Sequence, residues 1–139
     1  MSVVKIIYLV GTISFGIMCG IGHLMFELLG HKSGFVIQTL EGLSVSLPGK
    51  ETNMLLIDTG LSLVMGLMLF AYGVINLMII VDNWTITLPS NKIIIANIIF
   101  SLMVFFLVYK YLFIAPVVFV LIGFVSFSIV FIFQLSKTR

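Results

Sequence analysis

The sequence predicts an all-α integral membrane protein, a four-helix bundle with antiparallel up-down topology. Of its 139 residues, 61% are hydrophobic and only 9% are charged, and the mean hydropathy is +1.32. Soluble domains carry about 25% charged residues, because their surface must face water. Seven Lys and Arg with five Asp and Glu cannot cover such a surface. We therefore expect lipid to be the solvent for most of the exterior.

Four apolar runs are long enough to cross the hydrocarbon core as helices, which takes about 20 residues. We predict helices at 3–29, 54–81, 93–109 and 112–135, within a single transmembrane domain that spans residues 1–139. Only Lys110 and Tyr111 separate the third run from the fourth. These two helices must therefore form an antiparallel hairpin with Lys110 at its tip. The first run is longer than the apolar part of a signal peptide and lacks an Ala-x-Ala site, which favours a retained helix.

The segment from Gly30 to Asn53 is the only long connection. Within it, Leu43-Ser44-Val45-Ser46-Leu47 alternates in polarity, and Pro48-Gly49 is a turn signal. This pattern predicts a small strand-like flap that lies on the membrane.

The basic residues predict an orientation. With four crossings, Lys5, Lys92, Lys137 and Arg139 fall on one side, and Lys32, Lys50 and Lys110 fall on the other. Positive charge favours the cytoplasmic side, so both termini are expected in the cytoplasm. The net charge of +2 is small and scattered, which argues against a nucleic-acid partner.

Small and polar residues form a stripe on each of the first two helices when they are projected at about 100° per residue. The stripe of the first helix consists of Thr12, Gly16, Cys19, Gly20, His23 and Glu27, and that of the second of Asp58, Ser62, Gly66, Gly73 and Asn76. Small residues let helix backbones approach closely, and polar residues bond across the seam. We therefore expect Gly16 and Gly20 to meet Gly66, Gly73 or their polar neighbours.

Three ionisable residues are expected at the same depth. His23 and Glu27 lie near the end of the first helix, and Asp58 lies near the start of the second. Such residues are costly in hydrocarbon, which makes them candidates for a ligand or proton site. A secondary polar lining is predicted from Ser62, Asn76, Asn97 and Ser101.

Three interpretations of this site stay open. It is a hydrogen-bonded cluster that joins two helices, a site that handles protons or a cationic or polar headgroup, or a metal site. Nitrogen and oxygen ligands for a metal are available from His23, Glu27, His31 and Asp58. The sequence indicates no particular cofactor.

Short motifs in the first two helices resemble a known group. Gly20-Ile21-Gly22-His23, the segment Thr59 to Gly66, and the segment Gly73 to Leu77 are similar to small bacterial four-helix membrane proteins that neighbour the DoxX-like group. The resemblance implies a four-helix bundle in the bacterial inner membrane. It implies no established reaction and no catalytic residue.

Function is expected to follow from the polar pocket near one interface. The best interpretation is a small binding or accessory protein. One alternative is a small oligomeric transporter or channel for ions or a small solute, and another is a membrane enzyme that acts on a lipid or quinone. The sequence has no Gly-x-Ser-x-Gly motif, no cysteine pair and no phosphate loop. The outer faces of the third and fourth helices are rich in Phe and Ile, which suits lipid, a homo-oligomer or a larger membrane partner.

Overall fold

The computed structural model describes residues 3–30, 32–82, 88–111 and 114–137. The predicted apolar helices are confirmed, because four helical stretches are long and apolar enough to cross a membrane. The first consists of α1 (Val3–Thr12), a π-helical segment η1 (Ile13–Met18) and α2 (Cys19–Leu29); the others are α4 (Met54–Asp82), α5 (Asn91–Tyr111) and α6 (Ile114–Lys137). The predicted start of the fourth helix at Leu112 lies outside the described residues.

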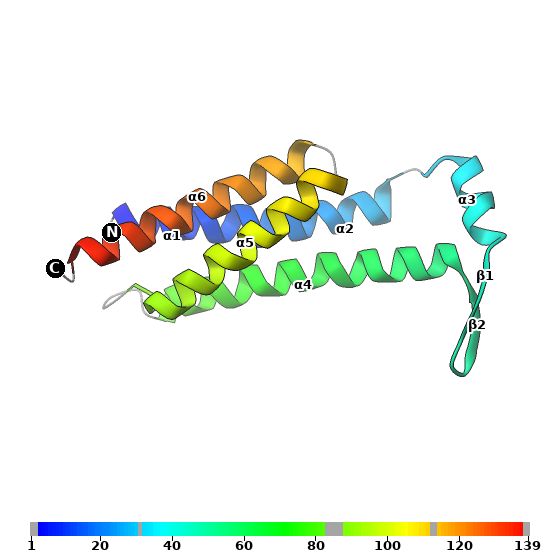
Figure 1. Ribbon diagram of the computed structural model, residues 1–139, viewed down its shortest axis with the longest axis horizontal. Helices are drawn as coiled ribbons and strands as arrows, with labels where there is room; N and C mark the ends of the chain where they lie inside the picture. The colour runs from blue at the N-terminus through cyan, green and yellow to red at the C-terminus, as the bar shows by residue number, and fades with distance from the viewer. Residues whose placement is uncertain (1–2, 31, 83–87, 112–113, 138–139) are drawn as a thin grey trace.

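The four long helices lie side by side, with both ends of the chain at one end of the molecule (Figure 1). α5 and α6 pack against each other, α1 packs against α6, and α2 packs against α4. α4 has 29 residues and α5 has 21. At about 1.5 Å per residue, α4 is longer by about 12 Å. The ends of α2 and α4 therefore project beyond the α5–α6 hairpin (Figure 1).

A small cap, residues 34–53, lies across that projecting end (Figure 1). It consists of α3 (Gly34–Glu41) and an antiparallel hairpin of β1 (Ser44–Leu47) and β2 (Lys50–Asn53). The predicted strand-like flap is thus present, with Gly49 at φ 81° in its turn, where glycine is favoured.

α3 was not predicted. It is only eight residues long, too short to show a clear helical period. The Ser33 side chain begins it by accepting a hydrogen bond from the Val36 N–H at 3.4 Å.

The core is centred on the first helix, the most buried of the four apolar stretches. Tyr8 and Phe15 are fully buried and meet side chains from the other helices. The Tyr8 ring packs edge-on against Phe127 of α6, with ring centroids 5.4 Å apart. Phe15 packs in the same way against Tyr72 of α4 at 5.5 Å. Such edge-to-face pairs add to the stability given by packing alone.

Glycines set the distance between helices, as the stripes predicted. A Cβ atom on Gly16 would lie 2.7 Å from the backbone nitrogen of Gly73, and one on Gly20 would lie 2.7 Å from the Cα of Phe70. Gly66 faces the side chains of Leu24 and His23. The first helix and α4 are therefore in backbone contact.

The first helix departs from the predicted regular α-helix at η1. The Cys19 N–H points to the carbonyls of both Gly16 and Ser14 where the π-helical segment ends. A π-turn takes one more residue than an α-turn, so a single projection at 100° per residue does not hold across it. Thr12, Gly16 and Cys19 are nevertheless all buried.

Candidate functional site

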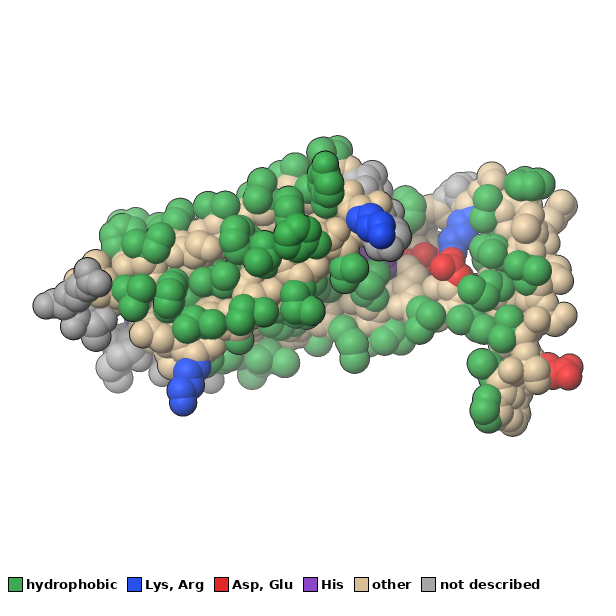
Figure 2. Space-filling view, viewed as in Figure 1, with side chains coloured by type: hydrophobic (Ala, Val, Ile, Leu, Met, Phe, Trp, Pro, Cys, Tyr) green, Lys and Arg blue, Asp and Glu red, His purple; other side chains and the backbone are tan. Residues whose placement is uncertain are grey.

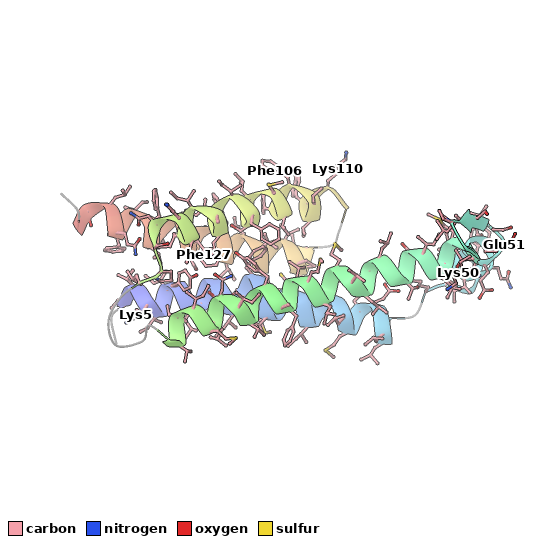
Figure 3. The ribbon with its side chains drawn as sticks, turned by 90° about the horizontal axis from the view of Figure 1, so that it is seen from below. Lys5, Lys50, Glu51, Phe106, Lys110 and Phe127 are labelled. Carbon is pink, nitrogen blue, oxygen red and sulfur yellow. The ribbon has the colours of Figure 1, made fainter. Side chains whose placement is uncertain are left out.

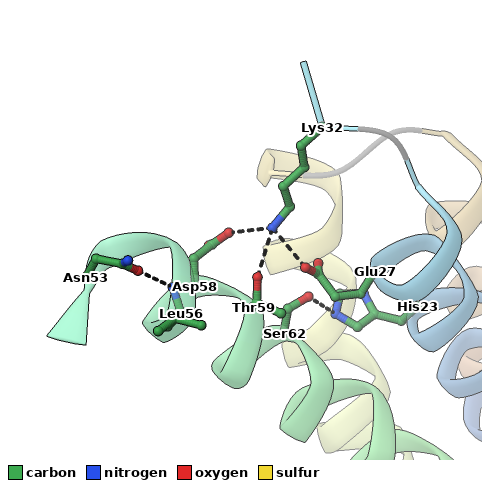
Figure 4. Close-up of polar contacts among 8 residues, drawn as sticks. All are labelled: His23, Glu27, Lys32, Asn53, Leu56, Asp58, Thr59 and Ser62. Atoms are coloured by element: carbon green, nitrogen blue, oxygen red, sulfur yellow. Dashed lines mark hydrogen bonds and ion pairs between the residues drawn. The ribbon is translucent and has the colours of Figure 1, made fainter. Parts of the chain in front are cut away.

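Two of the three predicted ionisable residues meet at one lysine. The Lys32 ammonium lies 2.8 Å from Glu27 Oε1 and 3.0 Å from Asp58 Oδ2 (Figure 4). Its remaining contact is with the Thr59 hydroxyl, at 3.4 Å. We call Glu27, Lys32 and Asp58 the ion-pair cluster. It joins the end of α2 to the start of α4.

His23 is not part of this cluster. Its Nε2 atom lies 3.0 Å from the Ser62 hydroxyl (Figure 4). Ser62 stands one helical turn after Thr59 on α4, so the two hydroxyls occupy neighbouring positions on one face. Ser62 also interacts with the Glu27 side chain, so His23 is linked to the ion-pair cluster through Ser62 and not through Lys32.

Local features place the carboxylates. α2 ends at Gly30, whose backbone is extended, and Lys32 follows two residues later. The Asn53 side chain accepts a hydrogen bond from the Leu56 N–H at 3.0 Å and so fixes the beginning of α4. Asp58 is the fifth residue of α4 and so lies just beyond its first turn.

The two carboxylates differ in exposure. The Glu27 side chain is 6% exposed, Lys32 is 28% exposed and Asp58 is 54% exposed. Glu27 is therefore the inner partner of the ammonium, and Asp58 is the outer one. The hydrogen bond to Glu27 and the contacts with Asp58 hold the pKa of Lys32 above its ordinary value of 10.5.

A shallow pocket of about 220 Å³ opens beside the cluster. Its lining combines charge, hydroxyl and apolar groups, from Glu27, Gly30, Lys32, Ile37, Leu55 and Thr59. Figure 2 shows basic and acidic side chains together where the bundle meets the cap, while hydrophobic side chains cover much of the rest of that face. The pocket thus combines polar groups with an apolar surround.

The described residues do not provide a set of ligands for the metal site that the sequence suggested. Among them, no three His, Cys, Asp or Glu side chains come together to hold a metal ion. His31, one of the predicted ligands, lies outside the described residues. The place between the two carboxylates is taken by the Lys32 ammonium.

A second polar cluster, which we call the core amide network, lies deep in the bundle. Asn97 Nδ2 donates to Asn76 Oδ1 at 2.7 Å and lies 2.9 Å from the Tyr8 hydroxyl. The Tyr8 hydroxyl donates to Asn76 Oδ1 at 2.7 Å, and the Tyr72 hydroxyl donates to Asn97 Oδ1. Tyr8, Asn76 and Asn97 are buried, so these bonds replace water.

The predicted secondary lining is therefore split. Ser62 lies beside the ion-pair cluster, whereas Asn76 and Asn97 join α4 to α5 in the core amide network. Ser101 is buried on α5, and its hydroxyl donates to the Ile98 carbonyl at 3.0 Å. The asparagines are bonded to each other and to tyrosines rather than arranged around an open axis.

Sequence reasoning missed Lys32, Tyr8 and Tyr72. Two carboxylates at one depth in an apolar chain need a cation within reach, and that requirement could have singled out Lys32 in the adjacent connection. A buried tyrosine needs a partner for its hydroxyl, which could have linked Tyr8 and Tyr72 to the asparagines. No protein-family model, curated protein or solved structure matches the chain.

Proposed function

We propose that this chain is a small polytopic membrane protein that acts as a binding or accessory protein, with the pocket beside the ion-pair cluster as its ligand site. One observation carries the proposal. Lys32 and the nearly buried Glu27 line an open pocket, and Lys32 also pairs with the half-exposed Asp58, which precedes the lining residue Thr59 in the chain. Two helices could be joined by apolar contacts alone, whereas charges placed at an open pocket are available to a polar ligand.

The proposal includes a membrane topology. The four apolar helices cross the bilayer in up-down order, with the pocket at one interface and both termini on the opposite, cytoplasmic side. The location of both termini at one end of the molecule supports this arrangement (Figure 1). The bacterial inner membrane is the membrane that the resemblance to the neighbours of the DoxX-like group implies.

The ligand is an amphiphile that enters from the bilayer. Its polar group takes the place beside Lys32 and Thr59, and its apolar part leaves the pocket past Ile37 and Leu55. A water-soluble ligand would make no use of the exposed apolar side chains that adjoin the lining residues in the chain, such as Phe26 beside Glu27 and Leu56 beside Leu55.

Lipids that remain bound during purification test the proposal. We would extract the protein in a mild detergent and identify bound lipids by native mass spectrometry. Less lipid should stay on Asp58→Asn and Lys32→Met than on the wild type. Glu51→Gln is the matched control, because Glu51 lies on the hairpin beyond the end of the bundle (Figure 3). An identical set of bound lipids in all four folded proteins would contradict a ligand role for the pocket.

Self-association is part of the same proposal. Large apolar side chains on α5 and α6 are exposed, among them Met103, Phe106 and Ile132. They suit lipid, a second copy or a larger membrane partner, and we propose a homo-oligomer. Native mass spectrometry that finds only monomer in mild detergent would contradict it.

A further inference from the structure

We propose that the ligand of this pocket is a zwitterionic phospholipid whose headgroup carries a primary ammonium, as in phosphatidylethanolamine. This inference rests on the proposed function and names the chemical class of its ligand. It follows from three features of the site: its charge balance, the unequal exposure of its two carboxylates, and the uncovered apolar surface beside it.

The charge balance of the ion-pair cluster selects against a purely anionic headgroup. Two carboxyl groups, Glu27 and Asp58, share the single ammonium of Lys32. A phosphate without an accompanying cation would have to approach both carboxylates and compete with them for that ammonium. The negative phosphate would be repelled by both carboxylates at hydrogen-bonding range of Lys32, so binding of an anionic lipid is disfavoured.

All three N–H donors of the Lys32 ammonium have an acceptor, in Glu27, Asp58 and Thr59. A phosphate can therefore bind Lys32 only by displacing one of these acceptors. Asp58 is the one that yields, because it is 54% exposed and Glu27 is 6% exposed. Displacement leaves the Asp58 carboxylate in need of another cation.

A zwitterionic headgroup completes this exchange. Its phosphate takes the Lys32 donor that Asp58 releases, and its ammonium takes the place of Lys32 at Asp58. The Lys32–Asp58 ion pair is exchanged for two, so the two ion pairs of the cluster become three while its net charge stays unchanged. Within the described part of the chain, only the Oδ2 oxygen of Asp58 is hydrogen-bonded, so Oδ1 is available to the incoming ammonium.

The primary ammonium is specified by its hydrogens. Ethanolamine offers three N–H donors to a carboxylate, whereas the quaternary ammonium of choline offers none. Charge-assisted hydrogen bonds are about twice as strong as neutral ones. Among the described residues that line the pocket, the apolar ones are Ile37 and Leu55 and none is aromatic, so they form no cage of the kind that binds quaternary ammonium.

The acyl chains have a surface to lie on. α2 and α4 project beyond the α5–α6 hairpin at the end where the pocket opens (Figure 1). Phe26 on α2 and Leu56 on α4 are exposed, and each adjoins in the chain a residue that lines the pocket, Glu27 and Leu55 respectively. A lipid held by its headgroup in the pocket would cover this uncovered stretch.

Lipid titration monitored by native mass spectrometry tests the inference. Delipidated full-length protein would be titrated separately with phosphatidylethanolamine, phosphatidylcholine and phosphatidylglycerol that carry the same acyl chains. We expect phosphatidylethanolamine to bind about tenfold more tightly than phosphatidylcholine, the effect of one charge-assisted hydrogen bond. Phosphatidylglycerol should bind most weakly. Asp58→Asn should remove the preference, and Glu51→Gln should retain it.

A second variant should bind one ligand more tightly than the wild type, whereas Asp58→Asn should only lose binding preference. Lys32→Met vacates the place of the cation between Glu27 and Asp58. This variant should lose the preference for phosphatidylethanolamine but bind a long-chain primary alkylammonium more tightly than the wild type does. A variant that is merely misfolded would bind neither lipid nor amine.

The outcomes separate the inference from the proposed function. Equal binding of all three phospholipids, abolished in Asp58→Asn and Lys32→Met, would overturn the ammonium specificity and leave the pocket as a binding site. Tightest binding of phosphatidylglycerol would overturn the charge argument. Lipid binding that no substitution changes would overturn both proposals.

Discussion

A Cβ atom added to Gly73 would lie 2.9 Å from the Cα of Gly16, so the first helix and α4 touch through their backbones. No side chain longer than hydrogen fits at either position unless the helices move apart. We therefore expect Gly16→Ala and Gly73→Ala each to lower the free energy of unfolding by about 1–3 kcal/mol, the usual cost of overpacking.

Thermal unfolding in detergent would measure this effect. Gly22→Ala is the matched control, because a Cβ atom on Gly22 would meet nothing within 4 Å. It should leave stability unchanged or raise it slightly, since alanine is the better helix former. Equal melting temperatures for Gly16→Ala and Gly22→Ala would show that the backbone contact does not govern packing.

Asn97→Ala should destabilise the bundle through the core amide network. The substitution leaves Tyr8, Tyr72 and Asn76 without a shared partner in a buried environment. We expect a loss of about 1–2 kcal/mol, since polar side chains between membrane helices contribute modestly. Ser128→Ala is the comparison, because the Ser128 hydroxyl donates to the Phe124 carbonyl of its own helix and joins no two helices among the described residues. A smaller loss for Asn97→Ala than for Ser128→Ala would count against the network.

Alkaline pH should weaken the ion-pair cluster. The pKa of Lys32 is raised above its ordinary value of 10.5 by Glu27 and Asp58. A raised pKa in the folded state stabilises the fold fully below the unfolded-state pKa, and this contribution is lost as pH rises through the folded-state pKa. The wild type should therefore lose more stability than Lys32→Met as pH rises above 10.5, the ordinary pKa of the lysine side chain. Melting curves of both proteins at each pH measure this difference. Parallel dependence of the two melting temperatures on pH would contradict the prediction.

Cys19 should resist labelling in the folded protein. It is the only cysteine in the chain, and it is buried where the first helix meets α6. We expect a maleimide to react at least about tenfold more slowly with Cys19 than with a cysteine on the cap, because reaction requires the helices to open. Cys19→Ser combined with Glu51→Cys provides that exposed cysteine. Equal rates would mean that the first helix is not held against its neighbours, and slow labelling would serve as the folding control for every variant above.

Hydrophobicity alone determined much of what could be predicted. Apolar runs of sufficient length gave the four long helices, and the close spacing of the last two gave the packing of α5 against α6. The placement of Lys110 at the tip of the hairpin was wrong, because α5 continues through Lys110 to Tyr111. The glycine stripes were also found as predicted, because only small residues permit backbone contact and Gly16 meets Gly73.

The ion-pair cluster could be predicted only in part. Helix ends placed Glu27 and Asp58 at one depth, but the cation between them comes from a connection whose path the hydrophobic pattern does not fix. His23 was assigned to the same group, although the Ser62 hydroxyl one turn further along α4 is its partner. Side-chain pairing depends on distances of an ångström, which a helical projection cannot resolve.

The π-helical segment η1 sets the phase between the two halves of the first helix. α1 packs against α6, and α2 packs against α4. The two halves of the first helix therefore contact different helices, which lie on different sides of it. The extra residue in the π-turn rotates the side chains of α2 about the helix axis relative to those of α1. Removing one residue between Ile13 and Met18 would turn His23 and Glu27 away from α4 while α1 kept its own seam. The orientation of His23 and Glu27 toward α4 thus depends on a segment in the middle of the first helix, more than one turn away from either residue in the chain.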